Sequence, residues 1–262
     1  MNEYLSGNKL YGDDFDHESI QKWFIAEEEG YSETPTASVD YRYNVINKVY
    51  GFKYLDKSEF KNALGFGAAF GSEFIPIIDK IKKLTIIEPS LKLRSKNIGH
   101  IQPEYHKPNP DGNIQFDSNS FDLITCFGVL HHIPNVSHVF NELVRVLAPG
   151  GYMLIREPIV SMGDWTKDRP GLTKNERGIP VEIFDRLIQQ NQLIVVNKAY
   201  CFTMTSVIVR VLNVPNILKR KSYILFDKYL SKLFKWNVTY HPQTKLRRIA
   251  PNSIYYVIKK PN

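Results

Sequence analysis

Between Asn62 and Arg156 the chain alternates short, nearly continuous apolar runs with stretches of helical spacing. The runs with strand character are Asn62–Phe66, Leu84–Glu88, Phe121–Phe127 and Gly151–Glu157. A strand that is apolar on both sides is buried on both faces, as in parallel sheets covered by helices. Strands that alternate with helices in sequence pair in parallel. The pattern therefore predicts an α/β fold: a doubly wound, mostly parallel sheet with helices on both faces.

The regions on either side of this core suggest two additions to it. Helical patterns over Asp16–Glu29 and Val39–Leu55 predict an N-terminal helical cap. After the core, a helix is expected at Val181–Gln190 and a strand at Leu193–Val196, while the last strand, Ser253–Ile258, comes only some fifty residues later. We therefore divide the chain into a cap (1–60), a core (61–198), an insertion (199–250) and a last strand of the core sheet (251–262).

Most of the positive charge of the chain lies in the insertion. Residues 205–248 contain ten Lys or Arg and one Asp, a net charge of +9. The whole chain carries +7, so the remainder carries −2. Two interpretations stay open: the insertion is a cap whose apolar face packs on the sheet and whose lysines are solvated, or it is the place where an anionic partner binds.

A glycine-rich turn follows the first strand. Gly65, Gly67, Ala69 and Gly71 place small residues where a ligand crosses the carboxyl end of a parallel sheet, and a backbone without Cβ atoms allows its close approach. Glu88 ends the next strand, where a carboxylate can accept hydrogen bonds from both hydroxyls of a ribose. The two features together indicate a nucleotide-like ligand.

The stretch SFDLI (Ser120–Ile124), LHHIPN (Leu130–Asn135) and RVLAPGG (Arg145–Gly151) resembles the central signature of class I S-adenosylmethionine (SAM)-dependent methyltransferases, in particular the small-molecule branch called type 11. The resemblance covers about residues 60–157 and extends less closely over 175–198. It implies a Rossmann-like fold, SAM as cofactor and methyltransferase activity.

The resemblance also assigns roles to the glycine-rich turn. It implies that Gly65, Gly67, Ala69 and Gly71 belong to the cofactor site, with the last three against the methionine and ribose parts of SAM. Glu88 would hold the ribose hydroxyls.

Four later positions complete the implied cofactor site. Asp111 is the candidate for the adenine amino group, and Phe116 for one side of the purine. Phe127 and Leu130 would line the cleft beneath the sulfonium.

The chain departs from the family pattern at two of these positions. The family usually has Asp or Glu where this chain has Gly65, and Gly where it has Ala69. The missing carboxylate normally helps to orient the amino end of the cofactor, a role that Glu73 in the following helix could take. If the loss abolishes SAM binding, the chain is a non-catalytic protein of the same fold that acts in binding or regulation.

The chemistry of methyl transfer narrows the candidates for catalysis. The sulfonium of SAM is already an activated electrophile, so the protein mainly aligns the reactants, and an alcohol acceptor also needs a base near its proton. His131 and His132 lie near the implied acceptor entrance, and Glu157 ends a predicted strand. These three are the candidate catalytic residues, and no metal site is predicted.

The expected acceptor is a small molecule or a glycan, with bacterial cell-surface polysaccharide synthesis as the specific hypothesis. The basic segment 205–248 suggests peripheral contact with an anionic membrane. An RNA methyltransferase is a further alternative, but no recognisable RNA-binding module accompanies the charge. The first thirty residues are polar and acidic, and the chain has only two cysteines, Cys126 and Cys201. Both features favour a cytoplasmic protein, and peripheral attachment to the inner face of the membrane stays open.

Overall fold

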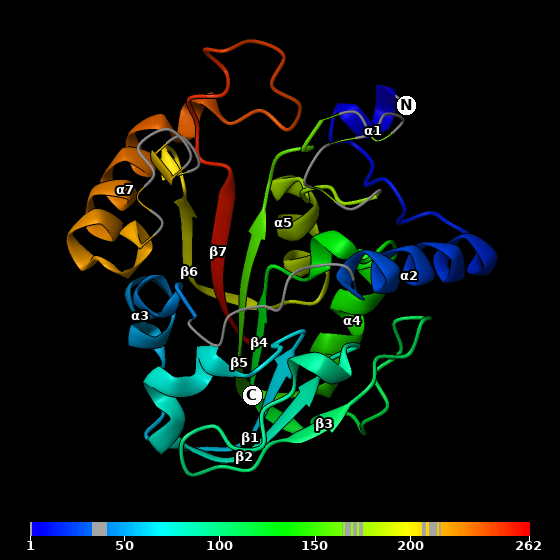
Figure 1. Cartoon of the computed structure of the whole chain (residues 1–262), viewed down its shortest axis with the longest axis vertical. Coiled ribbons are helices and arrows are strands. Elements are labelled where there is room, and N and C mark those ends of the chain that lie inside the picture. The colour runs from blue at the N-terminus through cyan, green and yellow to red at the C-terminus, as the bar shows by residue number, and fades with distance from the viewer. Residues whose placement is uncertain are drawn as a thin grey trace.

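A seven-stranded sheet forms the centre of the part of the chain that the computed structural model describes, which is residues 2–32, 41–163, 165, 169, 172, 175–205, 208–209, 214 and 216–262 (Figure 1). The strands are β1 (Phe60–Phe66), β2 (Ile81–Ile87), β3 (Glu104–His106), β4 (Phe121–Phe127), β5 (Leu147–Pro158), β6 (Ile194–Cys201) and β7 (Ser253–Lys259). Their order is β3-β2-β1-β4-β5-β7-β6. Strands β1 to β5 pair in parallel, and β7 runs antiparallel to both β5 and β6. The predicted doubly wound, mostly parallel sheet is confirmed.

The α-helices of the described residues are α1 (Asn2–Leu5), α2 (His17–Ser32), α3 (Asn44–Tyr50), α4 (Val136–Val146), α5 (Val181–Gln190) and α7 (Lys221–Phe234). The 3-10 helices are η1 (Phe52–Tyr54), η2 (Ser72–Lys80), η3 (Leu91–Leu93), η4 (Leu130–His132), η5 (Ile217–Lys219) and η6 (Lys235–Asn237). The helix expected over Val39–Leu55 is divided into α3 and η1, with Gly51 between them. Residues 39 and 40 lie outside the described part of the chain.

Helices cover both faces of the sheet, as Figure 1 shows with α4 and α5 on one side and α3 and α7 on the other. Successive side chains of a strand point to opposite faces, and β7 illustrates the result. Ile254, Tyr256 and Ile258 pack in the cluster that contains α4 and α5. Tyr255 and Val257 pack in the cluster that contains α3, η2 and α7. Two apolar faces explain why the strand sequences are apolar without alternation.

The segment after the glycine-rich turn is helical, but it is a 3-10 helix. Helix η2 contains Pro76, which has no backbone N–H and whose ring would collide with the carbonyl of Ser72 in an α-helix. The 3-10 form avoids that collision. It still buries Phe74, Ile77 and Ile78 against the sheet.

Strand β6 ends at Cys201, beyond the predicted end at Val196, and so continues into the range proposed for the insertion. Helix α7 is joined to the end of β6 by Asp227, whose carboxylate accepts the backbone N–H groups of Phe202 (2.8 Å) and Thr203 (3.0 Å). Within the insertion, residues 206–207, 210–213 and 215 lie outside the described part of the chain. Among the helices that the structure describes, none combines the length and apolar character that crossing a membrane requires.

Candidate active site

A pocket lies at the carboxyl ends of β1, β2 and β4, the edge at which open α/β sheets bind ligands. Its empty volume is about 1260 Å³, including space that is open to solvent. The predicted residues in its wall are Gly67, Ala69, Glu88, Phe116 and His132. The pocket therefore joins the glycine-rich turn, the ribose candidate and one catalytic candidate in a single space.

The turn after β1 takes a backbone form that favours glycine. Gly67 has φ = 66°, and a Cβ there would lie 2.5 Å from Val129 Cγ2. Gly71 also has φ = 66°, and its Cβ would collide with the Ile98 side chain. Ala69 adopts φ = 46°, which costs a non-glycine residue free energy. The turn thus holds the backbone of Gly67 and Ala69 against the pocket, while Gly71 packs behind it.

Glu88 is 5% exposed and is held by the backbone on both sides. Its Oε2 accepts the Ala69 N–H (3.1 Å) and its Oε1 accepts the Ser90 N–H (3.0 Å). Burial raises the pKa of Glu88, and the two backbone hydrogen bonds oppose that rise. A carboxylate has about four lone-pair positions. The two amides use two of them, so the group can still accept two ribose hydroxyls.

Gly65 lies in β1, outside the pocket wall. A Cβ at this position would be 2.6 Å from Ala68 Cβ and 2.9 Å from the Phe74 ring. An Asp or Glu side chain does not fit there without moving η2. The packing around Gly65 therefore leaves no room for the carboxylate that the family usually has at this position.

Glu73 does not replace the missing carboxylate at the pocket. Its side chain is 4% exposed, and its Oε1 accepts a hydrogen bond from the Thr125 hydroxyl (2.5 Å). Burial raises the pKa of Glu73 from 4.5 to about 7, although the hydrogen bond from Thr125 and the charge of Arg156 lower it. Near neutral pH this carboxyl is therefore partly protonated.

The raised pKa of Glu73 predicts a pH-dependent stability. The folded protein holds this proton more tightly than the unfolded chain does, so its stabilising contribution is present below pH 4.5 and is lost as pH rises through 7. We compare the free energy of unfolding of Glu73→Gln with that of the wild type at each pH. The difference should favour the variant by about 2 kcal/mol more at pH 8 than at pH 5. Urea unfolding at both pH values measures this, with Glu182→Gln on the exposed side of α5 as control. If the free energies of unfolding of variant and wild type differed by the same amount at both pH values, Glu73 would not titrate in this range.

Other predicted cofactor residues lie elsewhere. Asp111 lies beside the pocket wall, where its Oδ1 accepts a hydrogen bond from Gln21 Nε2 (2.8 Å). Phe127 packs on Tyr255, with ring centroids 5.5 Å apart, and Leu130 is fully buried in the core. Asp111, Phe127 and Leu130 are not among the residues that line the pocket. They lie behind the pocket wall or beside it.

Helix α2 closes one side of the pocket, a contribution that sequence reasoning missed. Phe24, Glu27 and Glu28 belong to the wall. The indole N–H of Trp23 donates to the carbonyl of His132 (2.8 Å), and Gln21 binds Asp111. The only signal in the sequence was the amphipathic pattern of α2, which does not say what the helix covers.

The two histidines after β4 occupy different environments, although their ring centroids are only 4.0 Å apart. His132 lines the pocket, and its Nδ1 lies 3.0 Å from Glu27 Oε2. Burial and the charge of His131 lower the pKa of His132. Burial would also lower the pKa of His131, but Glu157 and then Glu176 raise it to about 9. At neutral pH His131 is the cation and His132 is the neutral imidazole.

Glu157 is completely buried and organises the histidine loop. Its Oε1 accepts the backbone N–H groups of Val129 (2.8 Å) and Leu130 (2.9 Å). Its Oε2 lies 2.7 Å from His131 Nδ1. These contacts use both oxygens, so Glu157 positions the loop.

Arg177 is a second support of this loop that sequence reasoning missed. It is completely buried, and its guanidinium donates to the carbonyls of His131 (2.9 Å), Ile133 (2.8 Å) and Pro134 (3.1 Å). It also donates to the carbonyl of Tyr11 (2.8 Å), near the N-terminus. Burial lowers the pKa of Arg177 to about 10, so the group stays charged at neutral pH.

Comparison with known proteins agrees with this geometry. Residues 64–155 match the sequence model of the methyltransferase domain family. A segment of 61 residues is 36% identical to phthiotriol/phenolphthiotriol dimycocerosates methyltransferase 1 of Mycobacterium ulcerans, and it spans 22% of this chain and only 22% of that relative.

Solved structures share the fold at low sequence identity. The SAM-dependent methyltransferase of Mesorhizobium loti is 12% identical, with a TM-score of 0.53 over 79% of this chain and 94% of that one. Phosphoethanolamine N-methyltransferase 1 of Haemonchus contortus, solved with phosphoethanolamine and S-adenosylhomocysteine, is 12% identical, with a TM-score of 0.57 over 97% of this chain and 52% of that one. The fold of this chain is the class I methyltransferase fold.

Proposed function

We propose that this chain, whose residues 64–155 form a class I SAM-dependent methyltransferase domain, transfers the methyl group of SAM to a hydroxylated small molecule or glycan. One observation carries the proposal: a single pocket contains the glycine-rich turn, Glu88 and His132. A SAM molecule held by the glycine-rich turn and Glu88 would direct its methyl group toward His132.

The pocket wall fits the parts of SAM. The aromatic side of the wall, where the His106 and Phe116 rings lie 4.9 Å apart, suits the adenine. Glu88 suits the ribose, and the backbone of Gly67 and Ala69 suits the methionine part. When bound, SAM supplies a methyl group on a positively charged sulfur, which needs no further activation.

The protein itself must orient the acceptor and remove the proton of its hydroxyl group. A neutral imidazole can accept a proton from a hydroxyl, and the lowered pKa keeps His132 neutral at physiological pH. Glu27 orients the His132 ring, and Glu157 and Arg177 fix the loop that carries it. Helix α2 forms one side of the pocket wall, which would limit the access of water to the acceptor from that side.

Release of S-adenosylhomocysteine from SAM tests this function. The purified chain is incubated with SAM and with panels of small alcohols, soluble glycans and lipid-linked glycans. We expect acceptor-dependent release that falls at least about tenfold in Glu88→Ala at limiting SAM. No release with any acceptor, together with no SAM binding, would favour the non-catalytic alternative.

A second proposal concerns the basic insertion: it contacts an anionic membrane. Helix α7 and η6 expose a row of large apolar side chains at helical spacing, Leu225, Phe226, Tyr229, Leu233 and Trp236. Tyr229 and Trp236 are each 69% exposed. Lysines at 221, 228, 232 and 235 accompany this row. Exposed aromatic residues beside lysines are typical of interfacial helices, and this contact would suit an acceptor in cell-surface polysaccharide synthesis.

Vesicle pelleting tests the membrane contact. The wild type should bind phosphatidylglycerol vesicles at low salt, and Tyr229→Ser combined with Trp236→Ser should reduce binding by about tenfold or more. Leu91→Ser, which changes an apolar residue of similar exposure (65%) in η3, should leave binding unchanged. Equal binding of both variants, or binding to RNA but not to vesicles, would contradict the proposal.

A further inference from the structure

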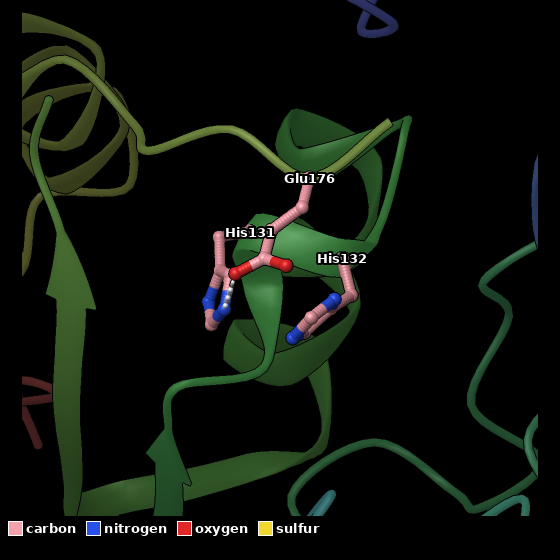
Figure 2. A group of neighbouring side chains, drawn as sticks. All are labelled: His131, His132 and Glu176. Atoms are coloured by element: carbon pink, nitrogen blue, oxygen red, sulfur yellow. Dashed lines mark ion pairs between the residues drawn. The ribbon is translucent and has the colours of Figure 1, made fainter. Parts of the chain in front are cut away.

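The histidine loop meets a carboxylate from a distant part of the sequence. Figure 2 shows His131 and His132 with Glu176, which approaches from the segment before α5. One possible ligand atom from each of the three residues lies within 4.8 Å of the others. His131 Nε2 is 3.5 Å from Glu176 Oε1. Among the described residues, this is the group of histidines and carboxylates with the spacing of a metal site.

Further carboxylates surround this group. Glu157 Oε2 lies 2.7 Å from His131 Nδ1, and Glu27 Oε2 lies 3.0 Å from His132 Nδ1. In metal sites, a histidine ligand commonly donates its other ring N–H to a carboxylate, which fixes the ring and makes the ligand more basic. Both histidines of this chain have such a partner, and in both cases the partner binds Nδ1. The arrangement is therefore that of a ligand set with its supporting groups.

The spacing suits a transition-metal ion. Metal–nitrogen and metal–oxygen bonds are about 2.0 to 2.2 Å long, so two ligands of one ion lie about 3 to 4.2 Å apart. The distance of 3.5 Å between His131 Nε2 and Glu176 Oε1 is in that range. All three ligand atoms lie within 4.8 Å of one another. Each side chain would therefore have to move by no more than about 1 Å to bind one ion together.

The side chains are shielded from bulk water but adjoin the pocket. The His131 and Glu176 side chains are 11% and 13% exposed, and the His132 side chain is 14% exposed. His132 and Glu27 line the cofactor pocket. An ion held here would lie beside the region that the proposed function assigns to the acceptor.

We propose that His131, His132 and Glu176 bind a divalent first-row transition metal ion such as Zn²⁺, which holds the oxygen of the acceptor. Metal binding would displace the proton that His131 carries in the metal-free protein. Two neutral imidazoles and one carboxylate suit this class of ion and leave coordination positions open for an oxygen ligand. A bound ion lowers the pKa of a coordinated hydroxyl.

This inference rests on the proposed function and refines it, because His132 would then be a ligand of the ion and not the base. The coordinated hydroxyl would lose its proton to water in the solvent-open part of the pocket. Its oxygen would attack the methyl carbon of SAM, and the carbon–sulfur bond would break to release S-adenosylhomocysteine.

Metal titration of untagged, chelator-treated protein tests the site. Zn²⁺ binding is followed by calorimetry, and Co²⁺ binding by its visible absorption. We expect one ion per chain, with affinity at least about 100-fold weaker in Glu176→Gln and in His132→Ala. His100→Ala, which changes an exposed histidine outside the pocket wall, should bind as the wild type does.

Two results would overturn the site: no stoichiometric binding of Zn²⁺ or Co²⁺, or equal affinity in the wild type and both site variants. SAM titration of the same metal-free samples separates this inference from the proposed function. If SAM binds and no metal does, the metal site alone is refuted. If SAM does not bind the folded protein with or without metal, the proposed function fails with it.

Discussion

Replacing Arg177 with methionine should lower the free energy of unfolding by about 4 kcal/mol, the largest effect we expect from a single substitution. The guanidinium is completely buried and satisfies carbonyls of the histidine loop and of Tyr11. Methionine fills most of the space but donates no hydrogen bond. The carbonyls of Tyr11 and Ile133 would then lose this donor, whereas those of His131 and Pro134 keep a backbone N–H, from Arg177 and Val136. A buried polar group without a partner costs about 1 to 3 kcal/mol. Urea unfolding monitored by tryptophan fluorescence measures the change.

Two further substitutions separate hydrogen bonding from charge. Arg177→Lys keeps the positive charge but cannot reach carbonyls in several directions, so it should recover only part of the lost stability. Arg186→Met removes an exposed arginine of α5 and should change stability by less than about 0.5 kcal/mol. If Arg177→Met were as mild as Arg186→Met, the histidine loop would not depend on the guanidinium.

Replacing His132 with alanine should lower kcat by about 100-fold or more while the Kd for SAM changes less than about threefold. The side chain lies in the pocket wall beside the acceptor region, whereas Glu88 and the glycine-rich turn hold the cofactor. The loss therefore falls on activation of the acceptor. Steady-state release of S-adenosylhomocysteine gives kcat, and calorimetry gives the Kd.

His100→Ala is the matched control for the His132 substitution, since His100 is exposed and outside the pocket wall. It should keep wild-type turnover. Unchanged turnover in His132→Ala would remove this residue from the catalytic candidates. A large loss of SAM affinity in His132→Ala would instead mean that it contacts the cofactor.

The strands of the core could be predicted because burial on both faces requires apolar residues at nearly every position. Helix α5 was predicted with its observed bounds, Val181–Gln190, because its apolar residues recur at helical spacing. Helix α3 is shorter than expected, since apolar spacing alone does not locate the break at Gly51. The end of β6 was predicted too early because an edge strand has less apolar sequence after Val196.

Five predicted residues line the pocket: Gly67, Ala69, Glu88, Phe116 and His132. Four of them come soon after β1, β2 or β4, where the sequence marks the edge of the sheet. Phe116, in the segment between β3 and β4, was predicted from the family resemblance alone. Glu27, Glu176 and Arg177 reach the same region from α2 and from the segment before α5. Their contacts join residues more than forty positions apart in the sequence, and no local pattern encodes such a pairing.

Calorimetric titration of SAM into the wild type and into Glu88→Ala tests whether this pocket binds the cofactor. We expect micromolar binding by the wild type and at least about tenfold weaker binding by Glu88→Ala, a loss of about 1.4 kcal/mol. Glu182→Ala, on the exposed side of α5, should bind as the wild type does. No binding by the folded wild type, or equal binding by wild type and Glu88→Ala, would contradict the assignment of this pocket to SAM.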